Sequence, residues 1–489
     1  MSLILDALSS VDADRPTLLG GGSGPVTAGG LLRRVDDLAA SLAAPGAVAV
    51  ALDNSPEWLA VDLALLGLGR PGVPVPLWFT PAQVGHLVSA AGLSAWIGRS
   101  PPSVPHGRGR DLGGGLGLWP LVSANETLLP AGTAKVTFTS GTTGQPRGVC
   151  LSGASLEKIA ASLADVGRAA GVRRHLCALP LPVLLENVAG AWAGMLAGAE
   201  VVVPPLAELG MKGGAEVDGA RFARAVRAHR AESLILVPQL LAALVAALEA
   251  GAPMPGGLRF IAVGGARVPA GLLARARRLG LPVHEGYGLS ECGSVVSLDA
   301  EGLPGAGVGR PLPHARVSLA PDGEILVDGE LMLGYAGQPG RVRRPWPTGD
   351  LGAIDDQGRL HVAGRKKNVF ITSMGRNISP EWIEAELTAE PGVFQAAVFG
   401  EGLPGPVALL SGPGLDEDRA RAAVERVSSR LPDYARPRRW RIADEPFTPD
   451  NGCATANGRP RRPAIETRYR DWLYGPSPEP VPSTEITLS

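Results

Sequence analysis

Residues 138–149 read FTSGTTGQPRGV, and six of the seven residues at 139–145 are glycine, serine or threonine. Such a composition is typical of a loop rather than of the interior of a strand or helix. Glycines allow backbone N–H groups to turn toward an anion, while the hydroxyl groups and the charge of Arg147 add donors. The stretch therefore predicts a polyphosphate-binding loop. The residues expected to contact phosphate are Thr139, Ser140, Gly141, Thr142, Thr143, Gly144 and Arg147.

Glycine- and serine-rich stretches are also common in surface loops that bind nothing. The segment differs from the usual P-loop, because no glycine stands five positions before a Gly-Lys-Ser/Thr triplet. A P-loop NTPase is therefore disfavoured. A second group of nucleotide-binding residues elsewhere in the chain would distinguish a phosphate site from a plain loop.

Such a group lies in the segment EGYGLSEC at residues 285–292. Tyr287 offers a flat ring on which adenine can stack, Ser290 a hydroxyl group for phosphate, and Glu291 a carboxylate for Mg²⁺. A lone tyrosine or glutamate in a loop is more often structural, but here the two segments occur together. Between them lies the small-residue triplet Gly264, Gly265 and Ala266.

Together these segments resemble the acyl-adenylate-forming superfamily, which includes acyl-CoA synthetases, luciferases and the adenylation domains of peptide synthetases. The resemblance runs from about residue 54 to residue 469 and includes five motifs in the family's order; residues 371–384, ITSMGRNISPEWIE, resemble bacterial long-chain acyl-CoA synthetases. It implies an α/β protein with a large N-terminal domain of layered β-sheets and helices and a small mobile C-terminal α+β domain. The expected ranges are 1–364 for the N-terminal adenylation domain, 365–474 for the mobile domain and 475–489 for a disordered, proline-rich tail.

The resemblance also implies roles for single residues. Asp350, in the segment TGDLG, would accept hydrogen bonds from both ribose hydroxyl groups, and its structural alternative is a turn aspartate. Arg365 would reach the ribose or the phosphates, Lys367 would be the interdomain hinge, and Glu291 and Thr143 would hold Mg²⁺. The adenine would be lined by Gly264, Gly265, Ala266, Tyr287 and Gly288, with Ser290 beside the phosphates.

The chain departs from the family's pattern at three positions. Relatives usually have lysine where this chain has Arg147, and a terminal lysine where TANGRPRR places Arg459. Arginine keeps the charge and can contact carboxylate or phosphate with a two-pronged donor, but its planar bulk differs from the compact charge of lysine. Val183 stands where relatives often have histidine or an aromatic residue at the edge of the acyl site. An unusual acid, a small oxyanion or a preformed adenylate therefore remains an alternative substrate.

The expected activity has two steps, by resemblance. A carboxylic acid attacks the α-phosphate of ATP with the help of Mg²⁺, pyrophosphate leaves, and the acyl group of the adenylate then passes to CoA. The catalytic residues would be Arg459, Glu291, Arg147 and Thr143. Two alternatives stay open: a ligase of a natural-product pathway with an amine or carrier protein as acceptor, and a non-catalytic nucleotide-binding relative. Intact Glu291, Asp350 and Arg365 argue against the second.

The whole chain sets further limits. Its 489 residues predict two or more domains, and its formal net charge of −1, without a long basic run, disfavours nucleic acid as a partner. The first residues lack the positive charge of a signal peptide, and apolar segments fall short of the roughly 20 residues that span a bilayer. Four cysteines without a C-x-x-C pair indicate neither zinc nor disulfides. We expect a soluble, cytoplasmic enzyme of open oligomeric state that acts on small molecules.

Hydrophobic periodicity predicts alternating strands and helices on a mainly parallel sheet in the first part of the chain. Alternating apolar residues with Asp-Gly turns at 315–330 predict antiparallel strands. Ser379 followed by Pro380 predicts the start of a helix. The remaining expected helices are 30–42, 55–69, 81–91, 154–169 and 417–431, and the expected strands are 47–51, 73–76, 201–203, 234–237 and 260–263.

Overall fold

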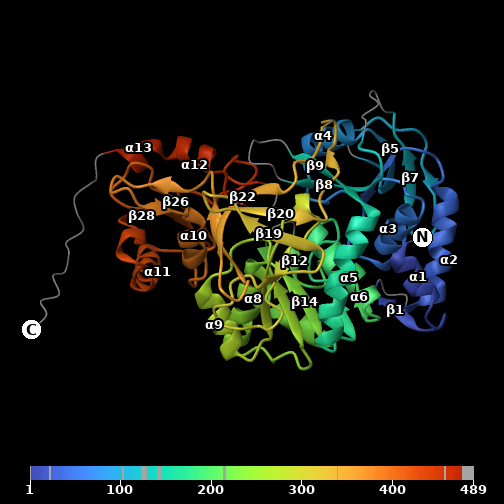
Figure 1. Cartoon of the computed structure of the whole chain (residues 1–489), viewed down its shortest axis with the longest axis horizontal. Coiled ribbons are helices and arrows are strands. Elements are labelled where there is room, and N and C mark those ends of the chain that lie inside the picture. The colour runs from blue at the N-terminus through green and yellow to red at the C-terminus, as the bar shows by residue number, and fades with distance from the viewer. Residues whose placement is uncertain are drawn as a thin grey trace, which may run out of the picture. The chain divides into compact units, whose positions relative to one another are not determined.

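The protein is described by a computed structural model (Figure 1). Its described residues are 2–20, 24–101, 104–122, 129–139, 146–212, 216–338, 340–455 and 459–475. The chain forms two compact units, residues 1–367 and 368–489. Each unit has its own apolar core and is treated separately below.

The first sheet of the first unit contains, among the described residues, eight strands in the order β21-β9-β8-β4-β3-β5-β7-β6. Strands β8, β4, β3 and β5 run parallel, and the remaining strands extend this core in antiparallel pairs. All five residues of β3 are buried, as expected for a central strand covered on both faces. The strands are β21 Gly334–Tyr335, β9 Arg147–Ser152, β8 Thr133–Thr139, β4 Gly72–Pro74, β3 Ala47–Ala51, β5 Leu93–Gly98, β7 Gly117–Pro120 and β6 Arg110–Asp111.

The second sheet contains nine strands within the described ranges, in the order β18-β17-β16-β15-β14-β10-β11-β1-β2. Its six central strands, from β16 to β1, are parallel, which confirms the predicted βα alternation. The strands are β18 Arg310–Pro311, β17 Ser297–Leu298, β16 Val283–Tyr287, β15 Phe260–Val263, β14 Ser233–Leu236, β10 Arg174–Leu176, β11 Glu200–Val202, β1 Pro16–Leu19 and β2 Val26–Thr27. A short hairpin is formed by β12 Met211–Lys212 and β13 Glu216–Val217.

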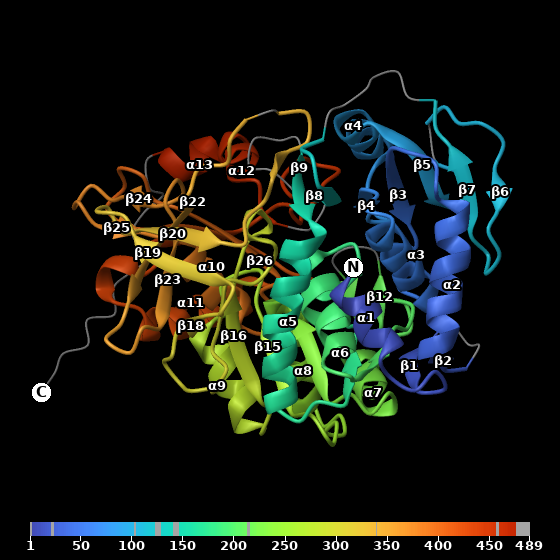
Figure 2. The same ribbon diagram turned by 45° about the vertical axis from the view of Figure 1, so that its right-hand side comes forward.

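Helices pack on these sheets, and local sequence explains their ends. In α4 the Thr80 hydroxyl and the Gln83 side chain form a reciprocal capping box, and Gly92 ends the helix with a left-handed φ of 57°. Helices α5 and α6 lie side by side in both views (Figures 1 and 2). The helices are α1 Leu3–Ser9, α2 Ala28–Ser41, α3 Pro56–Gly67, α4 Pro81–Ala91, α5 Gly153–Ala169, α6 Ala193–Leu196, α7 Gly219–Ala228, α8 Pro238–Glu249 and α9 Ala270–Arg278, with a π-helical segment η1 Leu185–Trp192 and a 3₁₀ turn η2 Ser290–Cys292.

A four-stranded antiparallel sheet completes the described part of the first unit: β19 Ala315–Leu319, β20 Glu324–Gly329, β22 Trp346–Ile354 and β23 Leu360–Arg365. The two units divide between Lys367 and Asn368, three residues after the boundary predicted from the sequence. Arg365 is the last residue of β23 rather than part of a linker. Lys366 is also held to the first unit, because its Nζ binds Asp322 at 2.6 Å and Glu324 at 2.9 Å.

The second unit is a small α+β structure. Ser379 and Pro380 stand at the start of α10, as predicted, although no side chain caps it by a hydrogen bond. Glu384 of α10 accepts from Val398 N at 2.7 Å and pairs with Arg462, so the helix is tied to β26 and to α12. The elements are β24 Phe370–Ile371, β25 Asn377–Ile378, α10 Pro380–Thr388, β26 Gln395–Phe399, β27 Val407–Ser411, α11 Glu417–Arg430, a 3₁₀ turn Asp433–Ala435, β28 Arg439–Ile442, α12 Arg462–Arg468 and α13 Arg470–Tyr474.

Candidate active site

The predicted phosphate loop joins two strands of one hairpin. Thr139 is the last residue of β8 and Arg147 the first of β9, and the two face each other in the antiparallel register. These two residues therefore belong to strands, not to the loop as predicted, because the ladder continues through them. The predicted contacts Ser140, Gly141, Thr142, Thr143 and Gly144 lie outside the described residues.

Arg147 is fixed by two contacts beyond its own strand. Its guanidinium carbon lies 3.5 Å from the centroid of the Tyr335 ring, and its Nη2 donates to Gln338 Oε1 at 3.2 Å. Tyr335 belongs to β21, which pairs with β9 so that Tyr335 faces Val149. This pairing brings residues almost 190 positions apart in sequence into contact.

Tyr335 also contacts the predicted magnesium ligand. Its hydroxyl donates to Glu291 Oε1 at 2.9 Å, and Met332 N donates to the Glu291 carbonyl at 2.7 Å. Burial and the neighbouring Glu291 charge raise the pKa of Tyr335, so the hydroxyl stays a donor. Tyr335 was not predicted from the sequence. A single tyrosine after a glycine carries no signal until the β21–β9 pairing is known.

A second cluster is formed by Tyr287, Asp350 and Arg365. Tyr287 Oη donates to Asp350 Oδ2 at 2.7 Å, and Arg365 Nε lies 3.0 Å from Asp350 Oδ1. The register of β22 and β23 places Asp350 opposite Arg365, and only 4% of Asp350 is exposed. Burial, followed by the Asp350 charge, raises the pKa of Tyr287. The three predicted nucleotide residues thus meet at one point.

The glycine-containing segments lie at the carboxyl ends of two neighbouring parallel strands, the usual place for ligands in such sheets. Gly264, Gly265 and Ala266 follow β15, and the pairing of Val263 with Glu285 places them beside the end of β16. At Gly288 a Cβ would lie 1.7 Å from the Ser294 carbonyl oxygen, so only glycine allows this close approach. Ser290 then begins η2.

Glu285 lies in β16, two residues before Tyr287, and was not predicted as a site residue from the sequence. Burial raises its pKa from 4.5 to about 7, although the charge of Arg267 opposes the shift. The only sequence signal was its position two residues before Tyr287. Its partners Arg267 and Val268 follow β15, so the environment arises from pairing between strands.

The described residues fit the predicted Mg²⁺ at Glu291. Its Oε1 accepts from Tyr335, while no partner is found for Oε2 among the residues that the structure describes, so one carboxylate oxygen can bind a cation. The other predicted ligand, Thr143, lies outside the described residues. A separate buried group, His175, Cys177 and Glu186, could also hold a metal by geometry. The atoms that could bind a metal already take part in hydrogen bonds, since Glu186 accepts from His175 at 2.8 Å and from Leu179 N at 2.7 Å.

The other two predicted residues lie at and beyond the boundary between the units. Lys367 is the last residue of the first unit. Arg459 is exposed in the second unit, where its backbone N–H donates to Thr455 Oγ1 at 3.1 Å. The clusters around Asp350 and Glu291 therefore form within the first unit alone.

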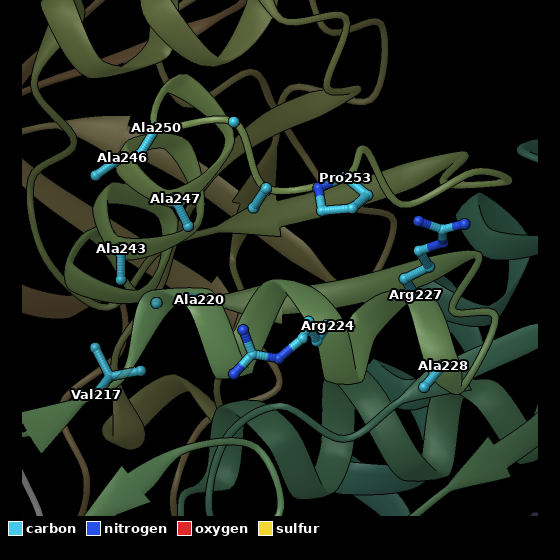
Figure 3. Close-up of a pocket in the computed structure, with 13 residues that line it drawn as sticks. Val217, Ala220, Arg224, Arg227, Ala228, Ala243, Ala246, Ala247, Ala250 and Pro253 are labelled. Carbon is cyan, nitrogen blue, oxygen red and sulfur yellow. The ribbon is translucent and has the colours of Figure 1, made fainter.

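A surface hollow lies elsewhere on the first unit, between α7 and α8 (Figure 3). It has a volume of about 860 Å³, and small alanine side chains of α8 and the arginines Arg224 and Arg227 of α7 line it. None of the predicted site residues is among its described lining residues. Each helix in the described ranges is too short or too polar to cross a bilayer.

Comparisons with known proteins point in one direction. Residues 8–337 match the family described as AMP-binding enzyme. The chain is 37% identical over 167 residues to the long-chain-fatty-acid–CoA ligase FadD15 of Mycobacterium bovis, which is 33% of this chain and 28% of that protein. It is 30% identical over 411 residues to a feruloyl-CoA synthase of Amycolatopsis, which is 76% of this chain and 79% of that protein. The match thus spans little more than a quarter of FadD15.

Solved structures share the fold. The o-succinylbenzoate CoA synthetase of Bacillus subtilis, in complex with its acyl-adenylate intermediate, has a TM-score of 0.75 and 22% identity, covering 95% of this chain and 98% of that one. ATP-bound MatB of Rhodopseudomonas palustris has a TM-score of 0.74 and 21% identity, covering 96% and 100%. The sequence match spans well over half of the chain and includes the two signature segments. The chain therefore belongs to the AMP-binding enzyme family.

Proposed function

We propose that the protein is an AMP-forming ligase that uses Mg²⁺ and ATP to adenylate a carboxylic acid and then transfers the acyl group to CoA. The observation that carries this proposal is the meeting of Tyr287, Asp350 and Arg365 in one cluster of a family member. The signature residue Glu291 keeps a carboxylate oxygen without a partner among the described residues. The similarity to CoA ligases supports the acceptor.

Asp350 is suited to hold the ribose. A carboxylate has about four acceptor positions, and Tyr287 and Arg365 use one on each oxygen. These positions accept hydrogen bonds, which is what the two ribose hydroxyl groups need. The contacts to Tyr287 and Arg365 fix the carboxylate before the nucleotide arrives, so little reorganisation accompanies binding.

The adenylation step requires correct positioning of the acid and ATP rather than a strong base. A carboxylate oxygen of the acid attacks the α-phosphorus as the bond to pyrophosphate breaks, and no proton moves. Arg147 would bind the departing phosphates, and Glu291 would hold Mg²⁺, which supplies positive charge when bound. In the second step the thiolate of CoA attacks the acyl carbonyl, and AMP leaves with the electron pair of the broken C–O bond.

The acid is proposed to have an apolar body. A Cβ on Gly265 would lie 3.6 Å from Val237 Cγ1 and 3.9 Å from Leu185 Cδ2, so aliphatic side chains face this glycine. Val183, at the predicted edge of the acyl site, is also apolar. Such a wall favours a fatty or aromatic acid over one with a second charge.

A second candidate is a nucleotide-binding relative that does not adenylate acids. Arg459 favours it, since arginine replaces the lysine expected at this position from the family resemblance. The test measures pyrophosphate release from ATP and Mg²⁺ with fatty acids, aryl acids and small oxyanions, with and without CoA. The Arg459→Lys variant is compared with Arg461→Lys, a control at a neighbouring exposed arginine.

We expect pyrophosphate release with one apolar acid class and AMP formation that depends on CoA. Release without any effect of CoA would point to another acceptor. Absence of release in wild type and both variants, from protein that binds ATP, would refute the ligase activity and favour the non-catalytic candidate. Release restored by Arg459→Lys alone would place the defect at that residue.

A further inference from the structure

Tyr335 touches both charged residues of the predicted polyphosphate site. Its ring lies 3.5 Å from the Arg147 guanidinium carbon, and its hydroxyl donates to Glu291 at 2.9 Å. The ring is itself held in place, since Trp346 packs against it edge-on with 6.5 Å between centroids. Backbone pairing of β21 with β9 sets its position along Arg147.

We propose that Tyr335 is a positioning residue that sets Arg147 and Glu291 as one unit for the binding of Mg²⁺ and polyphosphate. The inference rests on the proposed function, because it assumes that these residues meet a nucleotide. It adds a residue to the site and a reason for the arginine at position 147.

The ring contact explains why arginine suits this position. A planar guanidinium can lie flat on an aromatic face and still donate from its edges, whereas an ammonium group is compact and strongly hydrated. Arg147 uses one edge for Gln338, at 3.2 Å. With the ring on one face and Gln338 at one edge, the guanidinium has few orientations left. Within the part of the chain that the structure describes, its other N–H groups have no recorded partner, so they can donate to phosphate.

The hydroxyl contact acts on the other charge. By occupying Glu291 Oε1, Tyr335 orients the carboxylate and leaves Oε2 for a cation. Groups that hold a metal ligand in this way typically change metal affinity about 10- to 100-fold when removed. Arg147 and Glu291 thus contact different parts of the same neutral side chain, the ring and the hydroxyl group.

The two contacts can be separated by substitution. Tyr335→Phe keeps the ring and removes only the hydroxyl, whereas Tyr335→Leu removes both. Arg147→Lys removes the stacking partner and keeps the charge. The matched control is Tyr474→Phe, which removes a tyrosine hydroxyl that donates to Glu466 at 2.8 Å in the second unit. Thermal denaturation identifies variants that fold.

The measurement is calorimetric binding of ATP in EDTA, ATP with Mg²⁺, and AMP. For Tyr335→Phe we expect unchanged ATP affinity in EDTA and a gain on adding Mg²⁺ that is about 10-fold smaller than in wild type. For Arg147→Lys and Tyr335→Leu we expect ATP affinity in EDTA to fall about 3- to 30-fold, a range typical of cation–π contacts. AMP affinity should stay within about twofold in every variant, because AMP lacks the β- and γ-phosphates.

The double variant Arg147→Lys/Tyr335→Leu distinguishes coupling from two separate effects. We expect its ATP affinity in EDTA to equal that of the single variant that binds ATP more weakly. Losses that multiply, or a Tyr335→Phe variant whose Mg²⁺-dependent gain equals that of wild type, would overturn the proposal. ATP binding that follows the expected pattern without pyrophosphate release would refute the proposed ligase function and leave this inference standing. A wild-type protein that binds no ATP would refute both.

Discussion

A buried ion pair joins β8, the strand that precedes the predicted phosphate loop, to helix α3. Lys135 of β8 lies 2.8 Å from Asp62 of α3, and each side chain is 4% exposed. Asp62 Oδ2 also accepts from Asn187 Nδ2 at 2.9 Å and from Trp192 Nε1 at 3.0 Å, both on η1. Burial lowers the pKa of Lys135, while the charge of Asp62 opposes this shift. We expect Lys135→Met, which keeps the length of the side chain, to destabilise the first unit.

The expected loss of stability depends on the contacts that Asp62 keeps when the Lys135 charge is removed. Removing one partner of a buried pair costs roughly 3–5 kcal/mol, and Asp62 keeps two neutral donors, so we expect about 3 kcal/mol. Unfolding entropy of about 2.1 cal/mol/K per residue gives roughly 0.8 kcal/mol/K for the unit at 1–367. The melting temperature of that unit should therefore fall by about 4 °C. Adding Asp62→Asn removes the unpaired charge but keeps an acceptor, and should restore about half of the loss.

Differential scanning calorimetry measures both transitions in the intact chain. The second unit contains none of these four residues and serves as the internal control, so its melting temperature should not change. Two results would refute the reasoning: a first-unit transition within about 1 °C of wild type in Lys135→Met, or a double variant that is less stable than the single one.

Two further predictions concern stability in the first unit. Burial raises the pKa of Glu285 from 4.5 to about 7, so the folded protein binds a proton between these values that the unfolded chain releases. Stability should fall by up to about 3 kcal/mol as pH rises from about 4.5 to 7, and urea titrations of Glu285→Gln should lack this slope. At Gly190 an added Cβ would lie 2.1 Å from Glu186 Oε1 and 2.6 Å from His175 Nε2. Gly190→Ala should cost about 1–3 kcal/mol in urea unfolding. Gly167→Ala, with no atom within 4 Å of its Cβ, should be neutral or stabilising, and equal effects at both glycines would contradict the steric argument.

Periodicity in the sequence was enough to place much of the scaffold. The predicted strands 47–51 and 260–263 and the predicted helix 81–91 have the bounds seen in the structure, because short apolar runs, capping residues and Gly-Pro punctuation are local signals. The start of α10 is also confirmed. The predicted boundary lies three residues before the division between the units. Arg365, which looks like part of a linker, ends β23, and Lys366 pairs with Asp322 in the β19–β20 turn and with Glu324 of β20.

The contacts within the site were not predictable in the same way. Tyr287 and Asp350 could be named from their segments, but their hydrogen bond depends on packing between two different sheets. Tyr335 had no local signal, since its role arises from strand pairing with β9. The Lys135–Asp62 pair likewise joins a strand to a helix 73 residues earlier. All three sets of contacts depend on packing between segments that are far apart in the sequence, and the spacing of residues along the chain does not predict such packing.

The two clusters of the site balance charge in different ways, and this difference matches the proposed ligand. Asp350 is paired directly with Arg365, so that cluster is nearly neutral and offers hydrogen-bond acceptors. Arg147 and Glu291 instead each contact the neutral side chain of Tyr335, Arg147 at the ring and Glu291 at the hydroxyl group. A ribose carries no charge and needs acceptors, whereas a magnesium polyphosphate presents charges of both signs and needs a cation and an anion held apart. A nucleotide bound through both clusters would therefore gain charge compensation at its phosphates, where bond breaking takes place, and orientation at its sugar.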